Sequence, residues 1–247
     1  QTPESRILID CGIDPSEDGT ESYPYLDAPE FNVSDIDAII VTHSHLDHSG
    51  LVPYLFKFGY RGPVYCTLPT RDVMSLLQLD MVKIQRNEGK EPIYNSEEVR
   101  QTVLHTICLE YDEVADITPD IRITFYNAGH ILGSSIVHFN IGNGLHNFAY
   151  TGDLKYGRTN VLEAANTQFP RLETLMIEST YGGKDNVMAE EAADEYMVKI
   201  IKETFQRGGK VLMPVLGSGR AQEVMVIVER LIREKKIPEA PIYVDGM

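Results

Sequence analysis

The chain has 247 residues, of which 43% are hydrophobic, and it carries a formal net charge of −15 with three cysteines and no tryptophan. A chain of this size buries roughly three quarters of its unfolded surface, which excludes a disordered tail and a disulfide-stapled miniprotein. A pI near 4.8 argues against binding of nucleic acid by bulk charge, because phosphate attraction needs a basic face. We find no signal peptide and no apolar run near the roughly 18 residues of a membrane span, so we expect a cytoplasmic protein without membrane contact.

The cysteines stand at unrelated spacings and form no CxxC motif; they are Cys11, Cys66 and Cys108. An odd number of cysteines without metal-ligand spacing is typical of buried, reduced thiols in a cytosolic protein. We therefore interpret them as neither a redox pair nor a zinc ribbon.

Periodicity predicts the elements of the first two thirds of the chain, with residues 14–31 as a loop rich in Asp, Pro, Gly and Ser. A helix capped by Thr70 and a helix starting at Ser96 are predicted. The apolar face of the first is expected to hold Val73, Leu76, Leu77, Met81 and Ile84, and that of the second Val99, Val103, Leu104 and Ile107. Strands are predicted at 6–12, 36–42, 121–126, 148–151 and 174–177.

The last third has an α/β pattern. A helix is predicted from about residue 188 to 205, stopped by Gly208 and Gly209, and is followed by a strand at 210–216. A helix from about 220 to 235 and a strand at 241–245 complete the pattern. Because the chain opens inside an expected strand pair and stops just after the last strand, we expect it to be part of a longer protein.

The segment His43-Ser44-His45-Leu46-Asp47-His48 holds four metal-binding side chains within six residues, directly after a predicted strand. In extended chain, positions i and i+2 point the same way, so His43 and His45 can bind one ion together. Asp47 and His48 lie where the chain turns and can face a second ion. Imidazoles with a carboxylate suit zinc; the alternative is a polar loop that is rich in histidine by chance.

Two later residues could complete such a centre. His130 follows a predicted strand and is flanked by glycine turns, and Asp153 also ends a strand. Taken alone, they could be a capping histidine and a turn aspartate; beside the first cluster, both are predicted ligands. The remaining histidines, His105, His138 and His146, have no ligand-type neighbours and are interpreted as structural or surface residues.

These motifs together resemble the metallo-β-lactamase superfamily, in which an Asp after the first strand precedes the HxHxDH run, a later His and a later Asp. Glu178-Ser179-Thr180-Tyr181-Gly182 resembles the acidic motif of the β-CASP nuclease branch. The segments from Pro214 to Glu223 and from Ile242 to Met247 are most similar to archaeal homologues of the cleavage and polyadenylation specificity factor nuclease. The resemblance implies an α/β (α+β) fold. Residues 1–183 would form most of an αββα sandwich, two sheets with helices outside, incomplete at both ends, and 184–247 the beginning of an inserted, truncated β-CASP α/β domain.

The resemblance also implies two zinc ions, held by His43, His45 and His130 and by Asp47, His48 and Asp153, with Asp153 bridging.

Further roles are implied outside the ligand set. Asp47 would also accept a proton from the attacking water, and Glu178 would orient a ligand imidazole and fix its tautomer. Asp10 would brace the metal loop by hydrogen bonds. Ser218 and Arg220, in a glycine-rich turn before a helix, could bind a phosphate, although such turns are also common connections between a strand and a helix.

The family places a further zinc ligand and a proton-donating histidine after the inserted domain, and RNA-binding KH domains upstream; none of these lies in this sequence. The implied function is zinc-dependent hydrolysis of RNA phosphodiester bonds, as an endonuclease and as a candidate 5′-to-3′ exonuclease, in RNA 3′-end processing or transcription termination. RNA is the implied partner, with a homodimer formed through segments outside this sequence. The 247 residues alone are expected to be incomplete for catalysis.

Three rival functions stay open: a DNA nuclease, a small-molecule hydrolase of the same superfamily, and a non-catalytic scaffold that binds RNA. A diiron oxygen-reducing protein is disfavoured, because its resemblance would need Glu where His45 stands. A scaffold is disfavoured because all six expected ligands are present.

Overall fold

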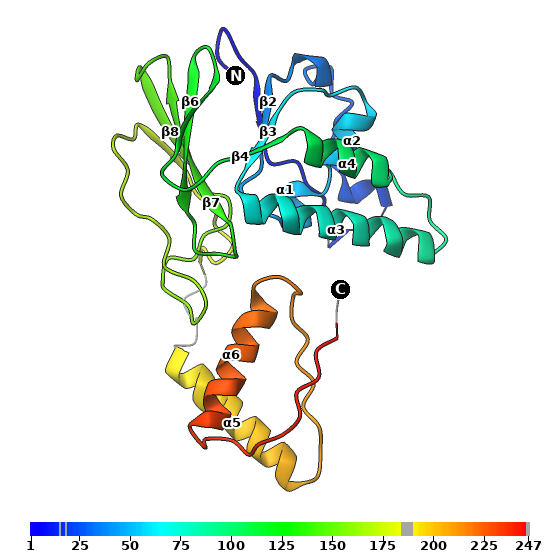
Figure 1. The fold of residues 1–247 in the computed structure, drawn as a ribbon, viewed down its shortest axis with the longest axis vertical. Helices are drawn as coiled ribbons and strands as arrows, with labels where there is room; N and C mark the ends of the chain where they lie inside the picture. The colour runs from blue at the N-terminus through cyan, green and yellow to red at the C-terminus, as the bar shows by residue number, and fades with distance from the viewer. Residues whose placement is uncertain (15, 18, 184–189, 246–247) are drawn as a thin grey trace. The chain divides into compact units, whose positions relative to one another are not determined.

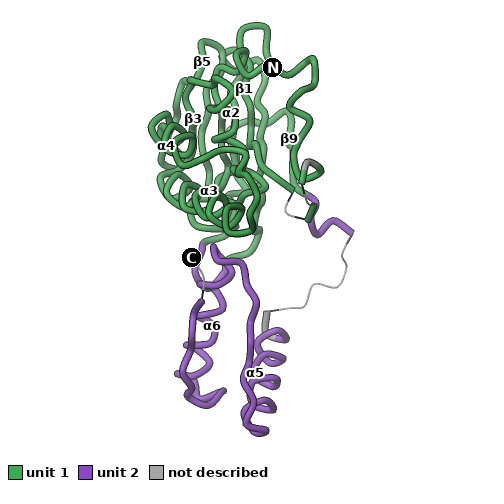
Figure 2. The backbone as a smooth tube through the Cα atoms, turned by 90° about the vertical axis from the view of Figure 1, so that its right-hand side faces the viewer, with its two compact units in different colours: residues 1–158, 163–178 green, residues 159–162, 179–247 purple. Residues whose placement is uncertain are grey.

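The computed structural model describes residues 1–14, 16–17, 19–183 and 190–245. The chain forms two compact units, one made of residues 1–158 and 163–178 and the other of 159–162 and 179–247 (Figure 2). No helix of the described residues is both long and apolar enough to cross a bilayer.

Unit 1 contains a four-stranded parallel sheet, sheet A, with strand order β1-β2-β3-β4. Its strands are β1 (Ile7–Ile9), β2 (Ala38–Ile40), β3 (Val64–Cys66) and β4 (Thr106–Cys108). Helices cover one face of sheet A, on the right in Figure 1. They are α1 (Leu46–Ser49), α2 (Val52–Lys57), α3 (Leu68–Asn87) and α4 (Ser96–Leu104).

The second sheet of unit 1, sheet B, has five strands in the order β5-β6-β7-β8-β9. The first four strands are antiparallel neighbours, and β9 joins β8 in parallel. Its strands are β5 (Val114–Thr118), β6 (Ile121–Asn127), β7 (Ser135–Ile141), β8 (His146–Tyr150) and β9 (Thr174–Met176). The predicted strands near β1, β2, β6, β8 and β9 are therefore confirmed, with shifted ends.

One hydrophobic core lies between the two sheets and another between sheet A and its helices, because alternate residues of each strand point to opposite faces. Ala38 and Ile40 of β2 face sheet B, whereas Ile39 between them faces the helices. From sheet B, Ile123 and Phe125 meet this layer and are fully buried. The two-sheet sandwich expected from the sequence is thus confirmed.

The two outer faces of the sandwich are covered differently in the described residues. Helices lie over sheet A, whereas the outer face of sheet B is covered by residues of the segments 154–158 and 163–172, which contain no helix. Its Ala165 is buried against Ala128 and Ala149 of sheet B.

Helix α3 begins earlier than predicted and buries a different face. Its cap is Thr67, whose Oγ1 accepts a hydrogen bond from Thr70 N–H, so the predicted cap Thr70 lies inside the first turn. Leu76 and Ile84 are exposed, while Gln78 is fully buried and donates from Nε2 to the carbonyl oxygen of Ser49 at 2.9 Å. The helix at Ser96 is confirmed as α4, although Leu104 is exposed and Ile107 lies in β4.

Unit 2 contains α5 (Glu190–Gln206) and α6 (Arg220–Arg233), which share a core of Ile201, Leu231 and Ile237. The predicted helix from residue 188 begins outside the described residues, at positions 188–189. The predicted strands 210–216 and 241–245 are wrong: neither segment is paired in a sheet of the described chain, and a strand needs a neighbour for its backbone N–H and C=O groups. Leu212 and Tyr243 are about nine tenths exposed in these segments.

Candidate metal centre

The HxHxDH segment lies at the carboxyl end of sheet A. Strand β2 ends at Ile40, and two buried residues later His43 begins the motif. His45 is the N-cap of α1, so Asp47 and His48 lie within the first turn of a helix. Asp10, directly after the neighbouring strand β1, lies beside them with a left-handed φ of 56°. Parallel strands thus deliver the motif and its support to one edge of the sheet.

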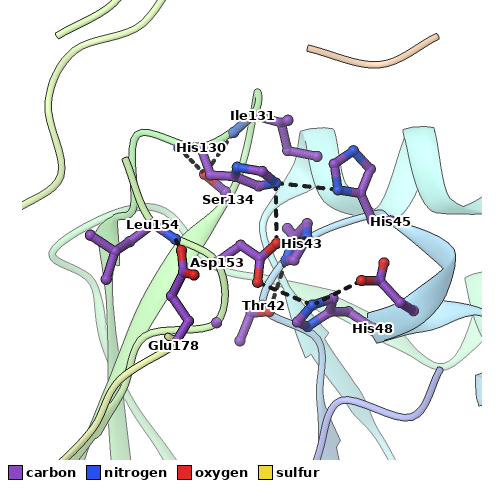
Figure 3. Close-up of polar contacts among 12 residues, drawn as sticks. Thr42, His43, His45, His48, His130, Ile131, Ser134, Asp153, Leu154 and Glu178 are labelled. Carbon is purple, nitrogen blue, oxygen red and sulfur yellow. Dashed lines mark hydrogen bonds and ion pairs between the residues drawn. The ribbon is translucent and has the colours of Figure 1, made fainter. Parts of the chain in front are cut away.

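Sheet B supplies His130 after β6 and Asp153 after β8. A tight turn holds His130: the Ser134 Oγ accepts hydrogen bonds from the backbone N–H groups of His130 (3.1 Å) and Ile131 (3.2 Å). Figure 3 shows the His130 and Asp153 side chains directed toward the motif from sheet A. Residues far apart in the sequence therefore meet at one edge of the sandwich.

Gly12 allows the segment after β1 to touch α1. A Cβ atom on Gly12 would lie 1.9 Å from the backbone carbonyl of Asp47, so only glycine fits without displacing the helix. Two backbone hydrogen bonds flank this contact, from Cys11 N–H to the carbonyl oxygen of His48 (2.7 Å) and from Ile13 N–H to that of Leu46 (3.0 Å). The metal-binding motif is therefore held by main-chain contacts on its β1 side.

All six predicted ligands converge in the structure. They form two groups of ligand atoms, each with all atoms within 4.8 Å of one another. The four-residue group consists of His43, His45, His130 and Asp153, and the three-residue group of His43, Asp47 and His48.

Asp153 lies between the two groups. Its Oδ2 is 3.6 Å from His130 Nε2 and 4.0 Å from His43 Nε2. Its Oδ1 is 3.4 Å from His48 Nε2. The two oxygens of one carboxylate thus face different groups, which is the geometry that the predicted bridging role requires.

Hydrogen bonding fixes the tautomer of His43. The Thr42 hydroxyl donates to Asp10 Oδ2 at 2.8 Å, so at His43 Nδ1, 3.1 Å away, it can only accept. The proton of a neutral His43 is therefore on Nδ1, and the lone pair of Nε2 points into the site. Nε2 is buried and has no hydrogen-bond partner among the described residues. A buried acceptor costs free energy unless something binds it, and a cation would do so.

His48 has the opposite electrostatic environment. Burial alone would lower the pKa of His48, but hydrogen bonds to Asp10 and Asp153, together with the charges of Asp10 and Asp47, raise it to about 10. Asp10 Oδ2 lies 2.7 Å from His48 Nδ1, so Nε2 is the atom available to an ion. Burial and the neighbouring imidazoles, in contrast, lower the pKa of His43.

These residues fit a divalent cation of the zinc type. Three imidazoles and one carboxylate form the four-residue group, and His130 Nε2 lies only 3.2 Å from His45 Nδ1. Imidazole nitrogens with carboxylate oxygens are the ligand atoms of zinc sites, and the far ring N–H of a ligating imidazole usually donates a hydrogen bond to a carboxylate that supports it. The set lacks the all-oxygen donors that calcium and magnesium prefer.

The other predicted site residues lie in three places. Asp10 accepts from Thr42 N–H (2.8 Å) as well as contacting His48, so it braces the motif as expected. Glu178 Oε1 accepts from Leu154 N–H at 3.1 Å, which ties it to the residue after Asp153. Ser218 and Arg220 lie in unit 2, at the turn before α6, where Arg220 N–H donates to the carbonyl oxygen of Ser218 (3.1 Å).

The remaining histidines have other partners. His105 Nδ1 is 2.9 Å from the carbonyl oxygen of Gln101, His138 Nε2 is 2.8 Å from that of Arg171, and His146 Nε2 is 3.1 Å from Thr174 Oγ1. None of them belongs to the two groups.

Sequence reasoning missed three supporting residues. Thr42 sets the His43 tautomer, Ser134 shapes the His130 turn, and Tyr150 lies within the electrostatic influence of Asp10 and Asp153. Burial, and then the charges of Asp10 and Asp153, raise the pKa of Tyr150 to about 12, so it stays a neutral donor. Thr42 adjoins the motif and Tyr150 begins the YTGD segment, but their partners become visible only when the sheets are assembled.

Known proteins resemble this chain over its full length. It is 54% identical over 249 aligned residues to the transcription termination factor FttA of Methanothermobacter thermautotrophicus and to that of Methanocaldococcus jannaschii. Each match covers 100% of this chain and 39% of the relative, so the chain spans about two fifths of the length of these relatives. A solved structure of a protein of unknown function from Enterococcus faecalis is 17% identical, with a TM-score of 0.51 over 81% of this chain and 52% of that one, and it shows a shared fold.

The family model of the metallo-beta-lactamase superfamily domain matches residues 1–180. This range covers both sheets and all six residues of the two groups. The chain therefore belongs to the metallo-β-lactamase superfamily.

Proposed function

We propose that the chain forms the catalytic part of a ribonuclease that hydrolyses RNA phosphodiester bonds with two zinc ions, in transcription termination or RNA 3′-end processing. The observation that carries the proposal is the pair of adjoining ligand groups that share His43 and face opposite oxygens of Asp153. Such a pair suits the two cations of a phosphodiester hydrolase. The names of the relatives, which are transcription termination factors, favour RNA over other phosphodiesters.

When bound, zinc would act as a Lewis acid that lowers the pKa of water and neutralises charge on the phosphate. The four-residue group would hold one ion. Asp47 and His48, with Asp153 as the bridge, would hold the other. A histidine outside this sequence, implied by the family resemblance, would complete the second site.

Asp47 and Glu178 have separate roles in this proposal. The Asp47 side chain is 44% exposed and its Oδ2 lies 3.6 Å from His48 Nε2. It can therefore be reached by water and take its proton. Glu178 accepts a hydrogen bond from Leu154 N–H, and its charge favours protonation of His130. We therefore propose that Glu178 holds the loop that carries Asp153 and orients the His130 imidazole.

Unit 2 supplies the proposed substrate contacts. We assign residues 1–183 to the catalytic domain and 184–247 to the beginning of an inserted β-CASP domain. Gly219, with φ 83°, is the N-cap of α6, in the turn before the helix, and makes no side-chain cap hydrogen bond. Ser218 and Arg220 in this turn would bind an RNA phosphate through a hydroxyl and a guanidinium.

The decisive experiment uses the full-length protein with a labelled RNA. Asp47→Ala should slow cleavage by about 10²- to 10⁴-fold, the usual cost of losing a general base, and His45→Ala should remove cleavage and lower zinc content. The matched control is His146→Ala, which removes an exposed imidazole outside both groups. Cleavage that survives both site variants would refute the metal mechanism.

The same proteins test the rival functions. If the zinc-loaded wild type binds RNA without cleaving it, the protein is a scaffold. If it cleaves single-stranded DNA as fast as RNA, it is a nuclease without RNA preference. Hydrolysis of a thioester or β-lactam, with RNA left intact, would indicate a small-molecule hydrolase. Molar mass in solution tests the homodimer that we propose to form through segments outside this sequence.

A further inference from the structure

Cys66 and Cys108 are neighbours in sheet A, although 42 positions separate them in the chain. They are paired residues at the carboxyl ends of β3 and β4. Adjacent strands lie about 4.8 Å apart, within the Cα separation of about 4.4–6.8 Å that a disulfide spans. Paired residues of adjacent strands place their side chains on the same face. The pair therefore needs little backbone movement to be joined.

The two cysteines are register partners on neighbouring strands, and the environments of their thiols differ. Cys66 is fully buried, whereas Cys108 is partly exposed, which corrects the expectation that all three cysteines are buried. The hydrogen bond from Cys66, with help from the Arg71 guanidinium and against the effect of burial, lowers the pKa of Cys108 to about 7.

A partly exposed Cys108 beside a buried Cys66 is the arrangement of an attacking cysteine, Cys108, and a resolving cysteine, Cys66. The thiolate is the reactive form of cysteine, and an accessible thiolate beside a second thiol is the usual arrangement of a redox-sensitive pair. Cys11 provides the contrast: it is buried, and burial, then the charge of Asp10, raises its pKa to about 12.

We propose that Cys66 and Cys108 form a reversible disulfide when the protein meets hydrogen peroxide. The Cys108 thiolate attacks one peroxide oxygen, an S–O bond forms as the O–O bond breaks, and the released hydroxide takes a proton to become water. The Cys66 sulfur then attacks the resulting sulfenic acid and loses its proton. The S–S bond forms as the S–O bond breaks, and a second water leaves. A small dithiol reverses the reaction.

The disulfide adjoins the support of His130. Thr67 follows Cys66 directly, and its Oγ1 donates to the carbonyl oxygen of Gly133 at 2.7 Å. Thr70 Oγ1 donates to the same oxygen at 3.0 Å. Gly133 belongs to the turn that carries His130. The S–S bond needs only a small shift at Cys66, but Thr67 beside it holds the turn directly, so even that shift weakens the support of the four-residue group. This consequence rests on the proposed metal centre.

The test treats the full-length protein with hydrogen peroxide and digests it with trypsin without reduction. The expected product joins peptides 62–71 and 101–122, with two hydrogen atoms fewer than their sum, and dithiothreitol separates them. Cys108→Ser should abolish this product and leave Cys66 unoxidised, whereas Cys11→Ser, the matched control, should not change it. Sulfinic acid at Cys108 with Cys66 still free would overturn the proposal.

Two measurements without RNA complete the test, so that failure of the proposed ribonuclease activity cannot be confused with failure of the disulfide. The rate at which Cys108 is alkylated in the reduced protein should rise with pH, with a midpoint near pH 7. A midpoint near the ordinary cysteine pKa of about 8.5 would contradict a reactive Cys108 thiolate. Oxidation should weaken zinc binding about 10-fold or more, the usual effect of disturbing the support of a ligand, but not in Cys108→Ser. Equal zinc affinity of the oxidised and reduced forms would overturn the link to His130.

Discussion

The two ligand groups of the candidate metal centre share His43 but are built differently. The four-residue group draws on both sheets and offers three imidazoles and one carboxylate. The three-residue group comes entirely from the HxHxDH segment, includes the exposed Asp47, and depends on Asp10 and Gly12 for its support. The comparison indicates that the first group can bind an ion with the residues present, whereas the second needs a further ligand. We therefore expect the first ion to be held more tightly.

The largest expected effect comes from Gly12→Ala. The added methyl would lie 1.9 Å from the Asp47 backbone, so α1 must shift or the β1 segment must move away. We expect a loss of about 3 kcal/mol in the free energy of unfolding, at the upper end for overpacking, together with loss of the three-residue group. Urea unfolding measures the effect. Gly157→Ala is the control, because its added methyl meets no atom within 4 Å; equal stability of the two variants would contradict the contact.

Single-ligand variants separate the two groups. His130→Ala should remove the tighter zinc ion, because it deletes one of four ligands, and should weaken binding by more than the 10- to 100-fold typical of losing a support. Asp47→Ala should leave this ion in place and affect only the weaker one. Competition with a chelator measures both, with His146→Ala as the reference. Loss of the tighter ion from Asp47→Ala would mean that the two groups are not separable.

Asp10→Asn should weaken the second group selectively. The Asp10 carboxylate contacts His48 Nδ1 and accepts two hydrogen bonds from Thr42. The asparagine side chain has the same shape as aspartate but no negative charge. We expect about 10- to 100-fold weaker binding of the second ion. Zinc titration followed by calorimetry should show the first step unchanged and the second displaced.

In the metal-free chain, the histidines of the two groups should affect the free energy of unfolding in opposite ways as the pH changes, and this effect should be smaller than those above. The pKa of His48 is raised to about 10, while burial, and then neighbouring imidazoles, lower the pKa values of His43 and His130. His48 should thus stabilise the fold below about pH 6.5 and lose this contribution toward pH 10. His43 and His130 stabilise it above about pH 6.5 and lose their contribution on acidification. Imidazole NMR titration should show His48 still protonated at pH 8, and a neutral His48 at that pH would contradict its carboxylate contacts.

The sequence was sufficient to predict the local part of the site. The HxHxDH run shows its chemistry within six residues, and the glycines beside His130 and Asp153 mark strand ends. What it could not show are the contacts between distant elements. Thr42, Tyr150 and Asp10 come from three strand ends, and the proximity of Cys66 and Cys108 depends on the order of β3 and β4. Spacing along the chain contains no signal for such pairs.

The errors in the fold have a similar origin. Hydrophobic periodicity placed Leu76 and Ile84 on the buried face of α3, but the helix turns Gln78 inward because Ser49 offers it a carbonyl. The segments 210–216 and 241–245 have the composition of strands, yet strand formation depends on a partner that local sequence does not specify.

The packing of α1 against the segment after β1 also has a consequence while the chain is being synthesised on the ribosome. Asp10, Gly12 and the whole three-residue group are complete once the ribosome has added His48. Asp153 is added roughly a hundred residues later, which at about 5–20 residues per second takes about 5 to 20 seconds. During this interval the nascent chain already presents two imidazoles and a carboxylate, so a cation captured early would meet the weaker half of the centre before the stronger half exists.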